Sequence, residues 1–490
     1  MSGRPGAGVD TLIRNVRVVD ATGSRNTSIL MQEGRIAALG DEAIAAAAQR
    51  PKAGGAVKQR LRPIMVIDLE GSDSLALMPA FVEPHAHLRD PGLTHKETLE
   101  SGLLAAAAGG YGSLVCMGNT KPVLDDIGLV RSLHERAGAL GLCELFPVLT
   151  LTRGMEGRDT GHLQALSAEE AHAAGVRLLS EDGKDLEDEG VFAAAFEEAA
   201  RLGIPVSCHC DAGGEAARRE KEAGASRDQW SRTEENTGTE RALRLGRAAG
   251  ARVHIAHVST KEALEMVRAA KADCRTAAAD PTGDGPAGPV TAEARLITAE
   301  SRLITAEATP MHLLLTRERA EALGAESHGR VNPPLREEED RRALIAGLVD
   351  GTIDMICTDH APHSPQDKEG GAPGFVGLET AFAALKTGLV DSGTISLEKL
   401  SSLMSLAPAR LLGLEDRGLV KEGLRADLVL VDLEADWTVE PAAFMSRGRN
   451  TPFSQMPMTA KVMATWQRGA LVWMARNPNE TEPYHPVEHP

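Results

Sequence analysis

Short apolar runs alternate with amphipathic stretches through the middle of the chain. Apolar runs bounded by turn residues are typical of buried β-strands, whereas apolar residues that recur every three or four positions are typical of helices. Eight such strand–helix units in succession favour a closed parallel (β/α)8 barrel of the TIM type over an open doubly wound sheet. Helices are predicted over 96–109, 191–203, 240–249 and 261–272. Strands are predicted to end near Arg89, Asn119, Thr152, Asp182, Cys210 and Thr260, within 290–310, and at His360.

Both ends of the chain are β-rich. Strand patterns occur at 11–20, 28–31 and 35–39, and similar patterns return at 426–432 and 460–466. We therefore expect an α/β protein in which both ends build one small β-sandwich domain beside the barrel. The expected division is 1–77 for the first part of this domain, 78–415 for the barrel and 416–490 for the second part.

Two segments interrupt this pattern. Residues 45–63 are rich in Ala, Gly and basic side chains, which predicts a loop insertion. Residues 290–310 contain three copies of a seven-residue unit, too few for a solenoid. The barrel needs one strand here, and the last copy, which runs into Pro310 and His312, is expected to supply it. The other copies are assigned to an inserted surface segment at about 275–303 that has no predicted catalytic role.

Composition narrows the possible partners and the location. A hydrophobic content of 42% is enough for a sizeable core, and with only 3% aromatic residues that core must consist of Ala, Leu, Val and Ile. The formal net charge of −17 argues against nucleic-acid and anionic-membrane partners, but it permits an anionic small molecule in a local cationic pocket. Six cysteines without a CxxC pair predict buried free thiols. No signal-peptide pattern and no apolar run of membrane-spanning length is present, so a cytoplasmic location is expected.

Several predicted strands end in a residue that can bind a metal ion. His85 and His87 lie two positions apart, so on a strand their imidazoles face the same side and reach one ion. Each candidate alone has a simpler explanation: a lone His-x-His pair can be two hydrogen-bonded histidines, and a lone aspartate can cap a helix. Together they predict one metal centre at the mouth of the barrel. The other candidates, each after a different apolar run, are Asp182, His209, His257 and Asp359.

The surroundings of these residues suggest hydrolytic chemistry. A metal lowers the pKa of bound water from about 16 towards about 7, and Asp359 at the metal edge could take its proton and deliver it to a leaving nitrogen. Arg89 lies on the same face as His87 and could pair with a substrate carboxylate, although a surface salt bridge is the simpler alternative. The amides of Asn119 and Asn332 could bind substrate or serve turns. His254 faces away from His257 on its strand and is interpreted as structural.

The motifs occur in a specific order along the chain. They are HAHLRDPG (85–92), GNT (118–120), SEDG (180–183), HVST (257–260), NPPLR (332–336), TDHAPH (358–363) and GLET (377–380). With these motifs the chain resembles the class I dihydroorotases of the amidohydrolase superfamily, from about residue 10 to about residue 475. It departs from the usual pattern at Ala80, at Glu83 and in the segment Pro310–His312, none of which is an expected metal ligand.

The resemblance implies a role for each site residue. His85 and His87 would bind a first zinc ion with Asp359, and Asp182 would bridge to a second zinc ion, so that each chain holds one or two. Asp359 would be the catalytic acid and base. The second zinc ion would be held by His209 and His257. The substrate would be bound by Arg89, Asn119, Asn332 and His363, with the backbone at Pro373 and Gly374 as a further candidate.

The activity implied by the resemblance is reversible hydrolysis of (S)-dihydroorotate to N-carbamoyl-L-aspartate in de novo pyrimidine biosynthesis, with metal-bound hydroxide as the nucleophile. A hydantoinase or allantoinase is the nearest alternative; the aspartate bridge, Arg89 and His363 count against it. A non-catalytic partner of aspartate transcarbamoylase is another, although the chain retains all six expected ligands. The sequence leaves open a homodimer and a complex with aspartate transcarbamoylase.

Overall fold

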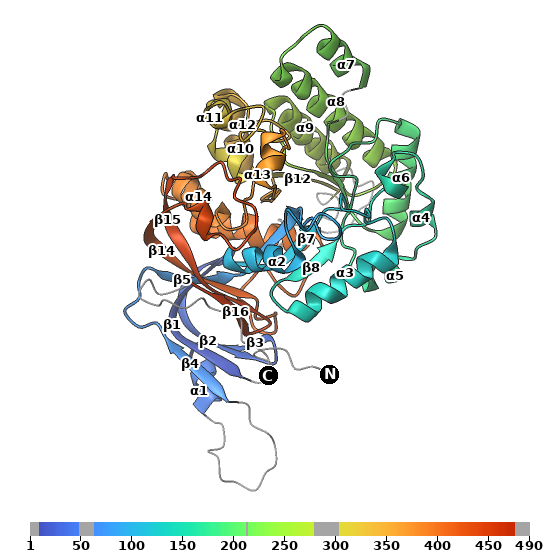
Figure 1. Cartoon of the computed structure of the whole chain (residues 1–490). Helices are drawn as coiled ribbons and strands as arrows, with labels where there is room; N and C mark the ends of the chain where they lie inside the picture. Colours follow the sequence, from blue (N-terminus) through green and yellow to red (C-terminus); the bar gives the residue numbers. More distant parts are fainter. Residues whose placement is uncertain (1–8, 49–62, 212–213, 279–302, 476–490) are drawn as a thin grey trace.

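The computed structural model describes residues 9–48, 63–211, 214–278 and 303–475 (Figure 1). The predicted insertion at about 275–303 falls almost entirely outside the described residues, and so do residues 49–62 of the predicted loop. The loop prediction is wrong at its start, because residues 45–48 belong to helix α1 (Gly40–Ala48). The run of alanines there has the highest intrinsic helix propensity of any residue type, which outweighs the absence of a clear periodic pattern.

Eight parallel strands form a closed ring. They pair in two sets, β6-β7-β8 and β9-β10-β11-β12-β13. Parallel bridges from Leu149 to Leu179 and from Ala86 to His360 join the two sets at both edges. The predicted (β/α)8 barrel is therefore confirmed. Its strands are β6 (Phe81–Ala86), β7 (Tyr111–Cys116), β8 (Glu144–Pro147), β9 (Leu179–Ser180), β10 (Val206–Cys208), β11 (Val253–Ile255), β12 (Ile304–Ala308) and β13 (Met355–Ile356).

The seven barrel strands for which an end residue was predicted all stop before that residue. β11 stops at Ile255, before His257, and β13 stops at Ile356, before Asp359. The cause is the backbone: His257 has a φ of 30° and Asp359 a φ of 47°, and this left-handed conformation cannot continue a strand. Apart from His85, which lies in β6, the predicted metal ligands thus lie in the first residues of the loops that follow the strands. The strand at the last copy of the repeat, β12, is confirmed.

Helices cover the outside of the ring (Figure 1). The predicted helix over 240–249 is only the end of α8, which begins after a capping box at Ser226. The first half of α8 lacks an apolar stripe because its buried positions include Ser231 and Glu235, so hydrophobic periodicity missed it. The helices are α2 (Leu99–Ala108), α3 (Ile127–Leu140), α4 (Gly161–Gln164), α5 (Ala168–Ala173), α6 (Glu189–Leu202), α7 (Gly214–Glu222), α8 (Arg227–Ala248), α9 (Lys261–Ala278), α10 (Pro310–Leu314), α11 (Arg317–Leu323), α12 (Glu338–Asp350), α13 (Pro365–Glu369), α14 (Ala381–Leu385), α15 (Leu397–Ser401) and α16 (Ala407–Leu411).

Strands from both ends of the chain share one sheet beside the barrel (Figure 1). Its order is β16-β15-β14-β5-β1-β2-β3, with β4 paired to β1, and the antiparallel pairing of β5 with β14 joins the N-terminal strands to the C-terminal ones. The predicted fold class, a barrel with a sheet domain from both chain ends, is confirmed. The sheet strands are β1 (Asp10–Asp20), β2 (Gly23–Gln32), β3 (Arg35–Leu39), β4 (Ile64–Asp68), β5 (Leu75–Pro79), β14 (Leu428–Thr438), β15 (Pro457–Gln467) and β16 (Ala470–Met474).

The core is largely aliphatic, with a few aromatic residues at its centre. Phe81, at the start of β6, is fully buried; its ring stacks on Phe382 at a centroid distance of 5.2 Å and meets the edge of Tyr111 at 5.6 Å. All six cysteines are buried and free, as predicted. In the described part of the chain, no helix combines the length and apolar character that a membrane span requires.

Replacing Phe81 by Ala should lower the free energy of unfolding by about 3–5 kcal/mol, because it leaves a cavity beneath the strand that carries the first site residues. Val66→Ala, at a β4 position that is 51% exposed, is the control and should change stability by no more than about 0.5 kcal/mol. Urea denaturation followed by circular dichroism measures both. Equal stability of the two variants would contradict the packing described for Phe81.

Candidate metal centre and active site

The strand β6 brings two histidines to the mouth of the barrel. His85 lies in β6 and His87 directly after it, and both are buried. Nε2 of His85 lies 3.2 Å from Oδ1 of Asp182, and Nε2 of His87 lies 3.3 Å from Oδ2 of the same carboxylate. Oδ1 of Asp359 lies 3.1 Å from Nε2 of His87 and 3.6 Å from Nε2 of His85. Two imidazoles and two carboxylates therefore face one point.

Two further histidines approach Asp182 from the loops after β10 and β11. Nδ1 of His209 lies 3.1 Å from Oδ1 of Asp182, and Nε2 of His257 lies 3.8 Å from it. The same two ring nitrogens are 2.7 Å apart. The carboxylate of Asp182 thus lies between the His85–His87 pair and the His209–His257 pair. This is the arrangement that a bridging ligand between two ions requires.

The residues present fit a metal ion. Donor atoms arranged tetrahedrally around zinc, with bonds of about 2.0–2.1 Å, lie about 3.3 Å from one another, close to the spacings found here. Within the described residues, Nε2 of His85 and Oδ1 of Asp182 are buried without a hydrogen-bonding partner, although they face each other. Buried polar atoms left in this way are rare unless a ligand satisfies them. Groups of ligand atoms within 4.8 Å of one another include His85–His87–Asp359 and His85–Asp182–His257.

Burial and the neighbouring imidazoles shift the pKa of the central carboxylate, that of Asp182, in opposite directions. Burial alone raises the pKa of Asp182, but the imidazoles of His85 and His209 outweigh it and hold the pKa well below its usual value. The carboxylate therefore stays ionised inside the protein. An anion that is buried among imidazoles is well prepared to receive a cation.

Three hydrogen-bonding groups orient the histidines, and their role was missed in the sequence. Oε1 of Glu307 lies 2.8 Å from Nδ1 of His85, so the other ring nitrogen of His85 is directed toward Asp182. Oδ2 of Asp211 lies 3.0 Å from Nε2 of His209 in the same way. The side-chain oxygen of Asn119 lies 3.0 Å from Nδ1 of His87, so this predicted substrate residue also orients a histidine. Such partners fix the tautomer of a metal-binding histidine.

No strong sequence signal marked these groups. Glu307 belongs to the last copy of the repeat, which has no motif around it, and Asp211 follows His209 by only two residues. His254, interpreted as structural, contacts the same network: its Nε2 lies 3.1 Å from Oε2 of Glu307. The two oxygens of the Glu307 carboxylate therefore contact one histidine from β6 and one from β11.

Glu83, one of the departures from the family pattern, lies beneath the site. Its carboxylate accepts hydrogen bonds from the backbone N–H of His85 at 2.9 Å and of Thr358 at 3.0 Å. Burial raises the pKa of Glu83 to about 8 in spite of these bonds. The side chain thus ties β6 to the segment that carries Asp359, which is a structural contribution to the site.

A buried cationic side chain lies beside the metal centre. Arg89 is buried, with 8% exposed, and has a φ of 62°, a strained backbone conformation that places its side chain toward the site. Its guanidinium lies 3.3 Å from Nε2 of His363 and donates to the carbonyl of Pro362. Burial lowers the pKa of Arg89 to about 10, so it remains charged. Burial and the charges of Arg89 and Lys96 lower the pKa of His363 to about 3, so its ring is neutral.

The remaining predicted substrate residues lie at different places around the site. Asn332 is brought to the site: its side-chain nitrogen lies 3.1 Å from Nε2 of His209 and 3.3 Å from Asp211. The carbonyl of Pro373 lies 2.9 Å from Nε2 of His363. Gly374 is already engaged within the protein, because its N–H donates to the carbonyl of Arg330 and its carbonyl accepts from Lys368.

The sequence matches the amidohydrolase family over residues 76–472. The chain belongs to the amidohydrolase family. Family members are typically metal-dependent, in agreement with the cluster of histidines and aspartates. The predicted class of enzyme, an amidohydrolase, is confirmed.

Curated relatives carry the name dihydroorotase. The dihydroorotase of Clostridium botulinum is 34% identical over 467 residues, which cover 94% of this chain and 99% of that protein. The dihydroorotase of Thermus aquaticus is 38% identical over 479 residues, covering 94% and 98%. These similarities confirm the resemblance seen in the motifs.

Solved structures share the fold. The L-hydantoinase (dihydropyrimidinase) of Arthrobacter aurescens has a TM-score of 0.76 at 25% identity and covers 94% of this chain and 95% of its own. The dihydropyrimidinase of Brevibacillus agri has a TM-score of 0.73 at 21% identity, covering 94% of each chain. These likenesses support the barrel with its sheet domain.

Asp182→Ala should remove most of the bound metal, because it deletes the carboxylate that contacts all four histidines. Elemental analysis of the purified protein measures the metal content per chain. Asp188→Ala is a matched control in the same loop: it removes only the N-cap of α6 and should cost about 1 kcal/mol of stability. Full metal occupancy in the Asp182 variant would contradict the central position given to this side chain.

Proposed function

We propose that the protein is a zinc-dependent dihydroorotase, which hydrolyses (S)-dihydroorotate reversibly to N-carbamoyl-L-aspartate in pyrimidine biosynthesis. The names of the curated relatives support the proposal. The observation that carries it is Arg89: a buried guanidinium beside the metal centre that, within the described ranges, forms no ion pair with a carboxylate. Asp359 and Asp182 attract this buried guanidinium from a distance without forming an ion pair with it, so it can still bind an anionic ligand directly.

The six candidate ligands suit zinc. Imidazole nitrogens and carboxylate oxygens at tetrahedral spacing are its common donors. We infer that His85, His87 and Asp359 hold one ion, that His209 and His257 hold a second, and that Asp182 bridges them. When bound, zinc supplies a water of lowered pKa and a positive charge that polarises the ring carbonyl.

The side chains then have distinct tasks. Arg89 binds the exocyclic carboxylate of dihydroorotate with its two-pronged guanidinium and so sets the orientation of the ring. Asn119 and Asn332 are proposed to bind polar groups of the substrate, with His363 and the backbone at Pro373 and Gly374 beside them. Asp359 takes a proton from the attacking water and delivers it to the ring nitrogen as the amide bond breaks. Ring closure uses the same contacts in reverse.

A hydantoin ring is the alternative substrate, supported by the fold likeness to hydantoinases. Such a ring need not carry a carboxylate, and it would leave Arg89 without an anionic partner. We therefore favour dihydroorotate. We also infer that 1–77 and 416–490 form the sheet domain and 78–415 the barrel domain.

Asp359→Asn should lower kcat for dihydroorotate by about 10²- to 10⁴-fold, since an amide cannot take up the proton. Turnover per bound zinc ion is measured, so that loss of metal is separated from loss of the acid and base. Asp350→Asn, at the end of α12, is the control and should leave turnover unchanged. An Asp359 variant that retains zinc and full turnover would exclude this residue as the acid and base.

Arg89→Met should lower kcat/KM for dihydroorotate by about 10- to 100-fold, the loss expected for a charge-assisted hydrogen bond. Dihydrouracil has the same ring without the carboxylate, so kcat/KM for this compound should change by less than about threefold. The measurement is the ratio of kcat/KM for dihydroorotate to kcat/KM for dihydrouracil, compared between the variant and the wild-type protein. Equal losses on both compounds would show that Arg89 does not bind the carboxylate.

A further inference from the structure

Two motifs contain residues for which the proposed reaction has no use. In the segment His257–Thr260 the histidine contacts Asp182, and in the segment Asn332–Arg336 the asparagine contacts His209. Ser259 is fully buried, and Arg336 is only 3% exposed. Their partners lie on α8, the helix whose buried polar face was not predicted.

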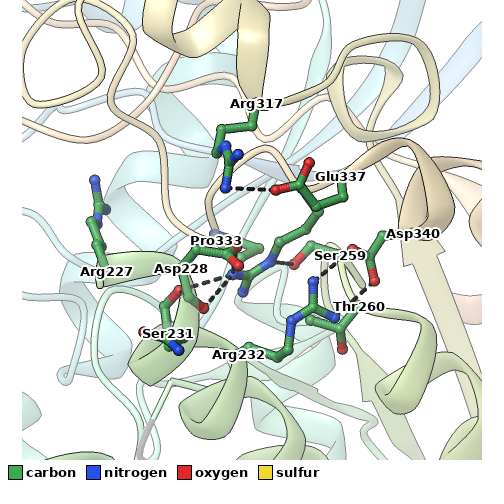
Figure 2. A network of polar contacts seen from close by, with 12 residues as sticks. Arg227, Asp228, Ser231, Arg232, Ser259, Thr260, Arg317, Pro333, Glu337 and Asp340 are labelled. Carbon is green, nitrogen blue, oxygen red and sulfur yellow. Dashed lines mark hydrogen bonds and ion pairs between the residues drawn. The ribbon is translucent and has the colours of Figure 1, made fainter. Parts of the chain in front are cut away.

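The guanidinium of Arg336 is enclosed by partners from two other elements. Nε donates to Oγ of Ser259 at 3.0 Å, and one terminal nitrogen lies 3.1 Å from Oε2 of Glu235. The other terminal nitrogen donates to Oγ of Ser231 at 2.9 Å and to Oδ1 of Asp228 at 2.8 Å. In Figure 2, Asp228 and Ser231 of α8 lie opposite Ser259, and all three accept hydrogen bonds from the guanidinium of Arg336.

Glu235 accepts hydrogen bonds from the backbone of the loop after His257. Its Oε1 accepts hydrogen bonds from the backbone N–H of Ser259 at 2.7 Å and of Thr260 at 2.9 Å. Its Oε2 accepts from the hydroxyl of Ser259 as well as from Arg336. Burial alone would raise the pKa of Glu235, but Arg336 and these donors outweigh it and lower the pKa, so the carboxylate is ionised.

The Glu235–Arg336 pair therefore joins both loops to one helix. His257 needs such support, because its φ of 30° is a strained conformation that persists only when the surroundings hold it. Asn332 lies four residues before Arg336 and reaches His209, the ring that meets His257 at 2.7 Å. The loop after His257 and the loop that carries Asn332 are therefore in contact at the active site through His209. Their other contact, through Glu235 and Arg336, holds both loops at a fixed distance from α8.

We propose that Glu235 and Arg336 are positioning residues, which set the distance between the metal-binding His257 and the substrate-side Asn332. This inference rests on the proposed function for its substrate side only. A buried ion pair usually contributes little net stability compared with well-packed apolar residues, because desolvation offsets the attraction. In this protein the pair sets geometry, because the seven hydrogen bonds described above meet at these two side chains.

The test measures zinc affinity, KM, kcat and the melting temperature of the metal-free full-length protein. Glu235→Gln and Arg336→Met should raise the Kd for zinc, determined by competition with a chelator, about 10- to 100-fold. KM for dihydroorotate should rise several-fold, and kcat should change less. Arg336→Lys keeps the charge but not the planar fork, so its Kd for zinc and its KM should fall between those of Arg336→Met and wild type.

Arg232 offers a matched control on the same helix. It pairs with Asp340 at 2.6 Å (Figure 2) and with Glu262 of α9 at 2.8 Å, and in the described part of the chain it forms no hydrogen bond or ion pair with Glu235 or Arg336. Arg232→Gln should lower the melting temperature without changing the Kd for zinc or KM. Ser259→Ala removes one hydroxyl from the network and is the variant to use if the changes at Glu235 and Arg336 prevent folding. Its Kd for zinc should also rise.

Variants of Glu235 and Arg336 that melt earlier but keep the wild-type Kd for zinc and KM would overturn the inference, because the pair would then be structural only. Failure of the proposed function gives a different result. Wild-type protein would bind zinc without hydrolysing dihydroorotate, and the Kd for zinc of the variants would still decide whether the pair positions His257.

Discussion

The structure depends on one buried carboxylate, that of Asp182, which four imidazoles approach from the ends of three strands. A buried anion is stable only when opposite charge or hydrogen-bond donors surround it. The barrel meets this requirement because strands that are far apart in the sequence all end at one rim. Every other feature of the site serves to hold these rings and the two aspartates against a common point.

Two sets of polar contacts support the site: one holds the histidine rings, and the other holds the backbone behind them. Glu307, Asp211 and Asn119 each contact the outward nitrogen of one histidine, and this leaves the inward nitrogen for a metal ion. Behind them, Glu83 joins β6 to the loop after β13 by accepting hydrogen bonds from backbone N–H groups, and Glu235 accepts such bonds from the loop after His257. Strained positions such as His257 and Asp359 are compatible with a stable fold because these contacts determine their backbone.

Sequence patterns predicted the barrel, and they singled out the residues that the structure gathers, because ligands are few and lie directly after apolar strands. They were less successful where the buried side chains are polar. The first half of α8 was missed because Ser231 and Glu235 face the interior, and Glu307 was not noticed because it lies in a repeat without a motif. Such partners are defined by contacts between elements, which periodicity along one element does not reveal. The predicted strand ends lie several residues too far along the chain, because the backbone leaves the strand conformation before it reaches the polar residue.

The most direct test of the account is a crystal structure of the zinc-loaded protein with anomalous diffraction recorded at the zinc absorption edge. The account predicts anomalous density at the barrel mouth, with His85, His87 and Asp182 at about 2.0–2.2 Å from zinc. Density at another place on the molecule, or zinc without Asp182 among its ligands, would contradict it.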